Sequence, residues 1–417
     1  METRRILSLQ PYYGESHRQF IDGWVAHSQH DWHLLTLPGR HWKWRMRHAA
    51  VEFTQQMKRL ADAGESFDAI VTTDMMNAAE LKGLLVAACP KFCRLPLVVY
   101  FHENQFAYPS QFGPDSPEHQ RDQHFGFTNF LSALAADQVW FNSIYNQQSL
   151  LYHLENSSRR WPDYSPKAQV KQLLEKFSVE APGIEQPPID VVDFHEQRSQ
   201  RRASASRLRI VWAARWEHDK NPQLLLDSLR QLKKQTDHFE ISVIGQRFRK
   251  APSAFEEIKS EFADHIRHWG FVTSREGYWA VLAESDVFVS TASHEFFGIA
   301  AAEAIAVGLH PLFPNDLAYP EMVQRLLSCT GTSSSESKLS ESDFLYAVGD
   351  GGATDLASRL ASLVSRQADV PHAVSTATQA TFLEQLAWTN RAKLMDQRLA
   401  DLAFTTERGG GYEIDVS

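Results

Sequence analysis

The chain has 417 residues, 43% of them hydrophobic and 22% charged, which indicates a globular protein large enough for two domains. The formal net charge of −9 argues against a broad nucleic-acid-binding surface, because contacts with phosphate require Lys and Arg. No apolar run approaches the roughly 18 residues that a membrane span requires, and the first apolar run is typical of a strand, not of a signal peptide. We therefore expect a cytoplasmic protein without stable membrane association, whose three cysteines are reduced.

The first half of the chain alternates between strand-like and helix-like patterns. Strands are predicted at residues 5–9, 32–37, 67–73, 95–101 and 138–142. Helical spacing occupies residues 16–28, 49–63 and 125–135. This alternation predicts parallel βαβ units and therefore a Rossmann-like domain with a doubly wound sheet, which we assign to residues 1–190.

The character of the sequence changes between residues 156 and 207, where prolines and a cluster of arginines interrupt the alternation. We place the domain boundary within residues 180–207, with a linker at 191–207, and find no recognisable motif in residues 144–207. Strands then resume at residues 208–213, 239–244, 266–271, 287–290 and 310–313, with helices at 222–234, 254–262, 275–283 and 297–307. A second Rossmann-like domain is predicted at residues 208–380, with a surface loop at 328–342 and a final amphipathic helix at 381–405.

The predicted fold class is α/β, with two Rossmann-like doubly wound domains that face each other across a cleft. In open α/β sheets, ligands bind outside the carboxyl ends of the strands. The polar motifs of this sequence follow predicted strands, so we expect them at these edges.

The first motif of the second domain follows the strand at residues 208–213 and contains two cations. Arg215 and Lys220 precede a helix that Pro222 opens, an arrangement that suits an anionic ligand such as a diphosphate. The alternative is a solvated loop in which these cations pair with Glu217 and Asp219.

The second motif follows the strand at residues 287–290 and opens a helix of small residues. Gly298 and the alanines after it allow the start of this helix to approach a ligand closely. Glu295 is placed to accept hydrogen bonds from sugar hydroxyls, and Glu303 to hold a ribose diol. The alternative is that Glu295 is an ordinary first-turn acid and Glu303 an exposed helix residue.

Two loops of the first domain carry candidate ligand-binding groups. Gly14 lies between the first strand and the first helix, where its backbone can approach a diphosphate; the alternative is a plain turn with Ser16 as the helix N-cap. His102, Glu103 and Asn104 end the fourth strand, where a histidine can position a sugar or share a proton with an acceptor. A structural histidine is the alternative.

A short segment interleaves cations with two tryptophans, the composition that binds nucleic acid by base stacking and phosphate contacts. It provides the candidate acceptor-binding residues Arg40, Trp42, Lys43, Trp44, Arg45 and Arg47. The alternative is a basic helix start whose tryptophans belong to the core.

Four segments together resemble the retaining GT-B glycosyltransferases of family 4, which carry Arg-x4-Lys and Glu-x7-Glu signatures. More narrowly, the chain is similar to the tRNA-queuosine α-mannosyltransferases. The segments that carry the resemblance are LPGRHWKWRMRHAA, YFHENQFAYP, RWEHDKNP and HEFFGIAAAEA.

This resemblance implies the roles of the site residues. It implies that Arg215 and Lys220 bind the donor diphosphate, that Glu295 contacts the transferred sugar and that Glu303 holds the ribose. Gly14 and His102 then face the sugar from the first domain, with Glu103 and Asn104 on the acceptor side. The donor-binding segment also contains Phe296, Phe297 and Gly298.

The resemblance further implies the reaction. GDP-mannose is the expected donor, and mannose is transferred with retention to queuosine in a tRNA anticodon, without a metal or another cofactor. A diphosphate oxygen takes the proton of the acceptor hydroxyl, and the last helix crosses back onto the first domain. Three alternatives stay open: a sibling transferase with a lipid or polysaccharide acceptor, a sugar-nucleotide epimerase, and an RNA-binding module without enzymatic activity.

Overall fold

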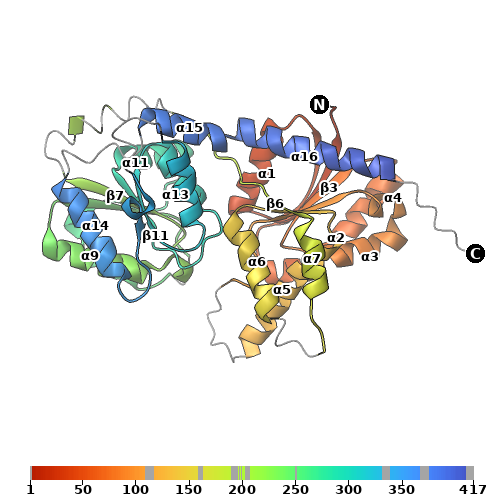
Figure 1. Cartoon of the computed structure of the whole chain (residues 1–417), viewed down its shortest axis with the longest axis horizontal. Helices are drawn as coiled ribbons and strands as arrows, with labels where there is room; N and C mark the ends of the chain where they lie inside the picture. The colour runs from red at the N-terminus through yellow and green to blue at the C-terminus, as the bar shows by residue number, and fades with distance from the viewer. Residues whose placement is uncertain are drawn as a thin grey trace, which may run out of the picture. The chain divides into compact units, whose positions relative to one another are not determined.

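The computed structural model describes residues 2–108, 117–157, 163–188, 196, 198, 200–201, 207–248, 251–330, 339–366 and 375–409. It divides the chain into two compact units. Unit 1 contains Met1–Gly183 and Trp388–Ser417, and unit 2 contains Ile184–Ala387 (Figure 1). None of the described helices is both long enough and apolar enough to cross a membrane.

Unit 1 contains a parallel six-stranded sheet in the order β2-β1-β3-β4-β5-β6. Its strands are β1 (Arg5–Tyr13), β2 (Asp31–Pro38), β3 (Ala69–Thr73), β4 (Leu97–Phe101), β5 (Gln138–Phe141) and β6 (Phe177–Val179). Its helices are α1 (Glu15–His27), α2 (Trp42–Asp62), α3 (Ala78–Ala88), α4 (Pro90–Cys93), α5 (Pro117–Ala135), α6 (Ile144–Ser157), α7 (Lys167–Leu174) and α16 (Trp388–Gly409). Strand β2 lies on one side of β1, and β3 and the later strands lie on the other side. The topological switch point of this sheet is therefore between β1 and β3.

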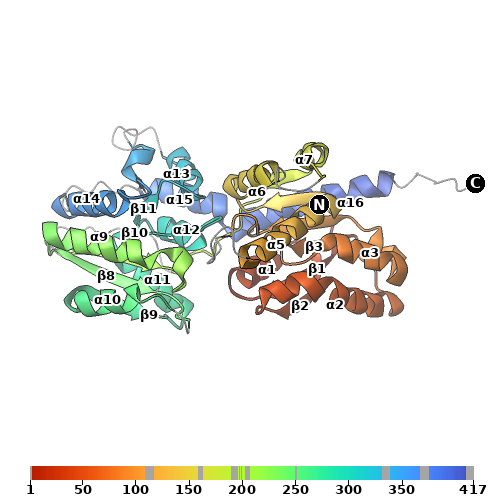
Figure 2. The ribbon, with the colours of Figure 1, turned by 90° about the horizontal axis from the view of Figure 1, so that it is seen from below.

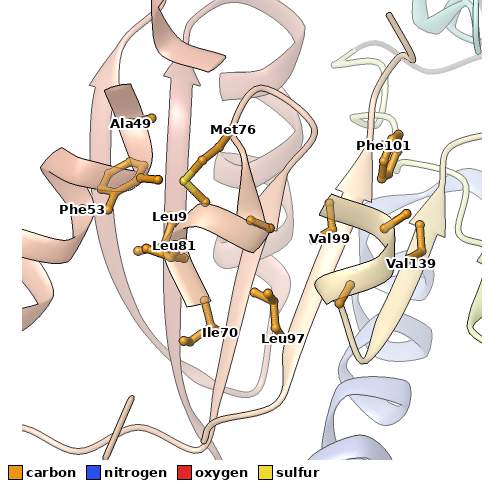
Figure 3. Close-up of a cluster of buried hydrophobic side chains, with 14 of the residues drawn as sticks. Leu9, Ala49, Phe53, Ile70, Met76, Leu81, Leu97, Val99, Phe101 and Val139 are labelled. Atoms are coloured by element: carbon orange, nitrogen blue, oxygen red, sulfur yellow. The ribbon is translucent and has the colours of Figure 1, made fainter. Parts of the chain in front are cut away.

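Helices cover both faces of this sheet because successive strand residues point to opposite sides. Leu9 and Ile70 pack with Phe53 of α2 and Leu81 of α3 on one face (Figure 3). On the other face, α1 and α16 lie side by side and share a second apolar cluster (Figure 2). The sheet is therefore buried on both sides, as a doubly wound sheet requires.

The last helix is held in unit 1 by a buried carboxylate. Asp396 is fully buried and accepts hydrogen bonds from Trp24 Nε1 at 2.8 Å and from the Ser28 hydroxyl at 2.9 Å. The backbone N–H of Gln29 also donates to this carboxylate, at 2.7 Å. A paired carboxylate at this depth fixes the register of α16 on α1.

Unit 2 contains a second parallel six-stranded sheet, in the order β12-β11-β10-β7-β8-β9. Its strands are β7 (Leu208–Ala213), β8 (Phe239–Ile244), β9 (Ile266–Gly270), β10 (Val287–Val289), β11 (His310–Pro314) and β12 (Leu345–Tyr346). Its helices are α9 (Pro222–Gln235), α10 (Ala254–Glu261), α11 (Arg275–Glu284), α12 (Ile299–Ala306), α13 (Tyr319–Ser328), α14 (Gly352–Ser365) and α15 (Thr376–Leu386), with 3₁₀ turns η2 (His218–Lys220), η3 (Ala263–His265) and η5 (Glu341–Asp343). Here the switch point lies between β7 and β10.

The predicted strands match the observed ones to within a few residues, and the fold class is confirmed. The single helix predicted at residues 381–405 is wrong, because Ala387 has an extended backbone and bridges to Ile184, which separates α15 from α16. Helix α2 begins at Trp42, well before the predicted residue 49. Residues 331–338 of the predicted surface loop lie outside the described residues.

The described part of the predicted linker contacts unit 2. Arg198 is buried and donates hydrogen bonds to the carbonyls of Ala283, Val307 and Gly308 at 2.9–3.1 Å. These carbonyls end helices α11 and α12, so this arginine satisfies acceptors that a helix end leaves open. The division between the units lies at Gly183, within the predicted boundary region of residues 180–207 but before the predicted linker at 191–207.

Candidate functional site

The cations and carboxylates of the second domain meet at the switch point of the unit 2 sheet. Strands β7 and β10 are hydrogen-bonded neighbours, with Ile210 paired to Val287 and Val211 to Phe288. The loop after β7 carries Lys220, and the loop after β10 carries Glu295. The chain continues from β7 to β8 on one side and from β10 to β11 on the other, and ligands of open α/β sheets bind between two such loops.

The loop after β7 is folded onto the loop after β10 by backbone contacts. The Thr291 hydroxyl donates to the Lys220 carbonyl at 2.8 Å, and the Ser293 N–H donates to the Asp219 carbonyl at 2.9 Å. Asn221 caps helix α9 and accepts a hydrogen bond from the Leu224 N–H at 3.2 Å. Lys220 is thus fixed at the end of a short 3₁₀ turn.

The ammonium group of Lys220 has three partners. Its Nζ donates to the His294 carbonyl at 2.8 Å and lies 3.3 Å from Glu295 Oε2 and 3.3 Å from Asp219 Oδ2. Only 8% of the residue is exposed. The structure therefore brings two of the predicted site residues, Lys220 and Glu295, into direct contact.

These ion pairs determine the charges of the site. Burial lowers the pKa of Lys220, but Glu295 and Asp219 outweigh it, so the pKa is raised. Burial raises the pKa of Glu295, and Lys220 more than reverses this, so the pKa is lowered. Burial, reinforced by the charge of Lys220, lowers the pKa of His294 to about 4. At neutral pH Lys220 and Glu295 are therefore charged and His294 is neutral.

Arg215 lies at the more open side of the same loop. Its side chain is 42% exposed, and its Nη1 lies 3.1 Å from Glu217 Oε2. The pairing that we gave as the alternative, Arg215 with Glu217 and Lys220 with Asp219, is therefore present. It coexists with the contact between Lys220 and Glu295, so the two interpretations do not exclude each other.

Glu303 lies in helix α12, and the alternative in which it is exposed is wrong. It is buried, pairs with Arg275 of α11 and accepts a hydrogen bond from the Tyr278 hydroxyl at 2.8 Å. Gly298 precedes α12 with φ at 88°, in the left-handed region that favours glycine. Phe296 and Phe297 are buried.

Several functional neighbours escaped the sequence analysis. Asp219 was considered only as an ion-pair partner in the alternative interpretation, His294 stood in a motif without a role, and Arg275 and Tyr278 were not identified. Arg275 carried one usable signal, because a cation in the first turn of a helix opposes the helix dipole and suggests an anionic partner. Nothing in the sequence identifies that partner as Glu303.

In unit 1, the loops after β1 and β2 cross each other closely at two glycines. A Cβ atom on Gly39 would lie 2.7 Å from Gly14 Cα, and one on Gly14 would lie 3.1 Å from Gly39 Cα. This crossing alone accounts for the small residue at position 14. Gly14 is itself the N-cap of α1, so the alternative with Ser16 as N-cap is wrong.

The loop after β4 is organised by buried polar groups. The His102 ring packs between aromatic neighbours, with ring centroids 4.0 Å from His17 and 4.9 Å from Phe20. Burial, together with His17, holds the pKa of His102 well below its usual value, so the ring is neutral. The His102 N–H donates to Oδ1 of the fully buried Asp74 at 2.9 Å. Burial, with a smaller contribution from Glu103, raises the pKa of Asp74 well above its usual value.

Asn104 supports this loop from within. It is fully buried, and its Nδ2 donates to Asn146 Oδ1 at 3.0 Å and to the Ser149 hydroxyl at 3.2 Å. Its Oδ1 accepts from the Ala107 N–H at 3.1 Å. The predicted contact of Asn104 with an acceptor does not fit this burial, whereas Glu103 is only half-buried and bonded to Gln105.

The basic segment at the start of α2 is largely exposed. Trp44 is 69% exposed, so the alternative in which both tryptophans belong to the core is wrong for this residue. Trp42 is half-buried against Phe125, with ring centroids 5.3 Å apart. Arg40, Lys43 and Arg47 are exposed, and Arg45 is half-buried. Within the described residues, no group of three or more metal-ligating side chains is found in either unit.

Comparison with known proteins gives two matching family models and a curated relative. Residues 5–184 match a family described as tRNA-queuosine alpha-mannosyltransferase N-terminal, and residues 193–334 match glycosyl transferases group 1. A tRNA-queuosine alpha-mannosyltransferase from Drosophila melanogaster is 35% identical to this chain over 326 residues. The match covers 76% of this chain and 81% of the relative.

Solved structures show the same two-domain fold at low identity. Sucrose-phosphate synthase from Thermosynechococcus elongatus is 15% identical with a TM-score of 0.67, covering 96% of this chain and 100% of that one. The catalytic domain of starch synthase IV from Arabidopsis thaliana, bound to ADP and acarbose, is 11% identical with a TM-score of 0.64, covering 96% and 100%. HepE from Anabaena, in complex with UDP, is 14% identical with a TM-score of 0.61, covering 95% and 100%.

Proposed function

The chain belongs to the tRNA-queuosine alpha-mannosyltransferase family, and on this premise we propose that it transfers mannose from GDP-mannose to queuosine in the anticodon of tRNA. It is a hexosyltransferase with the GT-B fold. The proposed reaction retains the configuration of the sugar, uses no metal or other cofactor, and takes place in the cytoplasm on soluble substrates.

The observation that carries the donor half of this proposal is the meeting of Lys220 and Glu295 at the switch point between β7 and β10. A cation and a carboxylate at one crevice suit a ligand that combines a diphosphate with hydroxyl groups. Arg215 adds a second, more exposed cation to the same loop. A sugar nucleotide has both chemical features, with its ribose assigned to Glu303.

The chemistry assigned to these residues is electrostatic. Lys220, Arg215 and the start of α12 stabilise the diphosphate as the glycosidic bond to it breaks, and one such donor contributes about 3 kcal/mol to lowering the barrier. The acceptor hydroxyl approaches from the face that the diphosphate leaves, and a diphosphate oxygen takes its proton. His294 is neutral, so its ring adds no positive charge beside Lys220.

The acceptor half of the proposal rests on unit 1. The exposed face at the start of α2 combines Trp44 with Arg40, Lys43 and Arg47. An exposed ring between cations suits an unpaired base and its flanking phosphates. This local positive charge offsets the formal net charge of −9 that the whole chain carries.

The direct test incubates the full chain with GDP-mannose and either a tRNA that carries queuosine or the same tRNA with guanosine in its place. Mass analysis of the digested nucleosides is expected to show one added hexose on queuosine and none on guanosine. UDP-glucose in place of GDP-mannose tests the donor, and anionic vesicles in place of tRNA test a lipid acceptor. Modification of guanosine-bearing tRNA or of lipid, or conversion of the donor sugar without an acceptor, would reject the proposal.

A further inference from the structure

The ammonium group of Lys220 already lies among acceptors. It donates hydrogen bonds to the His294 carbonyl and to Glu295, and it lies 3.3 Å from Asp219 Oδ2 in an ion pair. A phosphate oxygen that binds this Nζ would lie beside two carboxylates, and the repulsion between like charges favours binding when one carboxylate moves away.

The three partners differ in how readily they can leave. The His294 carbonyl belongs to the backbone, and its bond at 2.8 Å is the shortest of the three. The Asp219 side chain is 2% exposed, whereas the Glu295 side chain is 26% exposed. Moving Asp219 would leave a carboxylate buried without its cation, which is costly. Glu295 is the more exposed of the two carboxylates and can turn toward another ligand.

We infer that Glu295 and the donor diphosphate compete for Lys220, so that diphosphate binding releases Glu295 to the hydroxyls of the transferred sugar. The inference rests on the proposed function, in which Lys220 binds the diphosphate and Glu295 the sugar. It adds that these two contacts are coupled through one ion pair.

Glu295 is an effective competitor because it is charged at neutral pH. Burial alone would favour its neutral form, but Lys220 holds the pKa of Glu295 below its usual value. A nucleoside diphosphate without a sugar must separate this ion pair, and it provides no sugar hydroxyl that Glu295 can bind instead. The intact donor provides hydroxyls that replace Lys220 as the partner of Glu295. The coupling therefore favours the intact donor over the nucleoside diphosphate product.

The test measures binding of GDP and of inorganic pyrophosphate to the full chain by calorimetry. The variants are Glu295→Gln, Lys220→Ala and the double variant, and circular dichroism checks that each one folds. Glu295→Gln is expected to bind both probes about fivefold more tightly or better, because the competing charge is gone. In the Lys220→Ala background the same substitution is expected to change affinity less than about twofold, since coupled residues are non-additive.

Glu284→Gln is the matched control, because it removes the same charge from another acid of unit 2 that is 28% exposed, against 26% for Glu295, and that pairs with Arg267. Its affinity for pyrophosphate is expected to equal that of the wild type. Unchanged or weaker binding by Glu295→Gln overturns the inference, as does equal tightening in Glu284→Gln or in the Lys220→Ala background. Binding of neither probe by the wild-type chain would instead reject the proposed function itself.

Discussion

Both units place polar residues after the carboxyl ends of parallel strands, but these residues are charged in unit 2 and neutral in unit 1. At the switch point of unit 2, Lys220 stays charged among carboxylates. In unit 1, burial favours the neutral forms of His102 and Asp74, and an amide network fixes their loop. A site for a diphosphate needs fixed charge, whereas a site that positions a neutral sugar or base needs shape. The charges of unit 2 and the neutral groups of unit 1 thus match the two roles that the proposed function assigns to them.

The largest effect that would test this comparison is expected from Lys220→Ala. Loss of this cation removes electrostatic stabilisation of the departing diphosphate, so kcat is expected to fall at least a hundredfold, or roughly 3 kcal/mol. Circular dichroism is expected to show a folded protein. Steady-state transfer of mannose to queuosine-bearing tRNA measures the effect. Near wild-type turnover would remove Lys220 from the reacting site.

The second prediction concerns pH, because each unit encloses a neutral histidine. The unfolded chain protonates His294 near pH 6.5, whereas the folded chain does so only at about 4. Between these values the unfolded state binds more protons, so stability falls as the pH falls. At pH 5 this residue is expected to lower the free energy of unfolding by roughly 2 kcal/mol relative to pH 8. His102 acts in the same direction.

Urea unfolding at pH 8 and at pH 5 measures this loss of stability. His294→Gln and His102→Gln, which stay neutral throughout, are each expected to reduce the difference between the two pH values. If His294→Gln leaves the difference in the free energy of unfolding between the two pH values unchanged, the ring of His294 is solvated and not buried in unit 2 as described. If only His102→Gln leaves it unchanged, unit 1 does not enclose its histidine as described.

The same contrast between the two units explains which features could be predicted from the sequence. Ten of the twelve described strands were predicted, because buried parallel strands are short apolar runs with polar ends; β6 and β12, with three and two residues, were missed. Lys220 and Glu295 stood out as charges shortly after such runs. Unit 1 was harder, because burial and not residue type gives Asp74 and Asn104 their roles. Six described helices were not predicted: α3, α4, α6, α7, α13 and α14. For α3 the reason is that it is apolar on most sides. The pairing of Arg275 with Glu303 joins two helices that no sequence pattern connects.

The third prediction tests whether unit 1 recognises the acceptor through its surface. Trp44→Ala is expected to raise KM for tRNA about tenfold while kcat changes little, because stacking of one base contributes about 1–3 kcal/mol. Arg47→Ala is expected to reduce the salt dependence of tRNA binding, since fewer counterions are released. Tyr152→Ala is the control, because Tyr152 is 64% exposed elsewhere on unit 1 and is expected to have no effect. Equal effects of the Trp44 and Tyr152 substitutions would contradict a specific acceptor surface.

The smallest effect is expected at Tyr278. It tests whether the partners of Glu303 contribute to donor binding in unit 2 in addition to Lys220. The Tyr278 hydroxyl donates to Glu303 Oε2 at 2.8 Å, while Arg275 pairs with the other oxygen. Tyr278→Phe frees the carboxylate to turn away from the ribose, so KM for GDP-mannose is expected to rise about fivefold with kcat nearly unchanged. Tyr346→Phe is the control, because it removes a buried hydroxyl that donates to the Ser290 carbonyl, also at 2.8 Å, and leaves Glu303 untouched. If KM rises for Tyr278→Phe alone, the Tyr278 hydroxyl positions Glu303. If KM rises equally in both variants, the Tyr278 hydroxyl contributes only to general stability, and Arg275 alone positions the carboxylate.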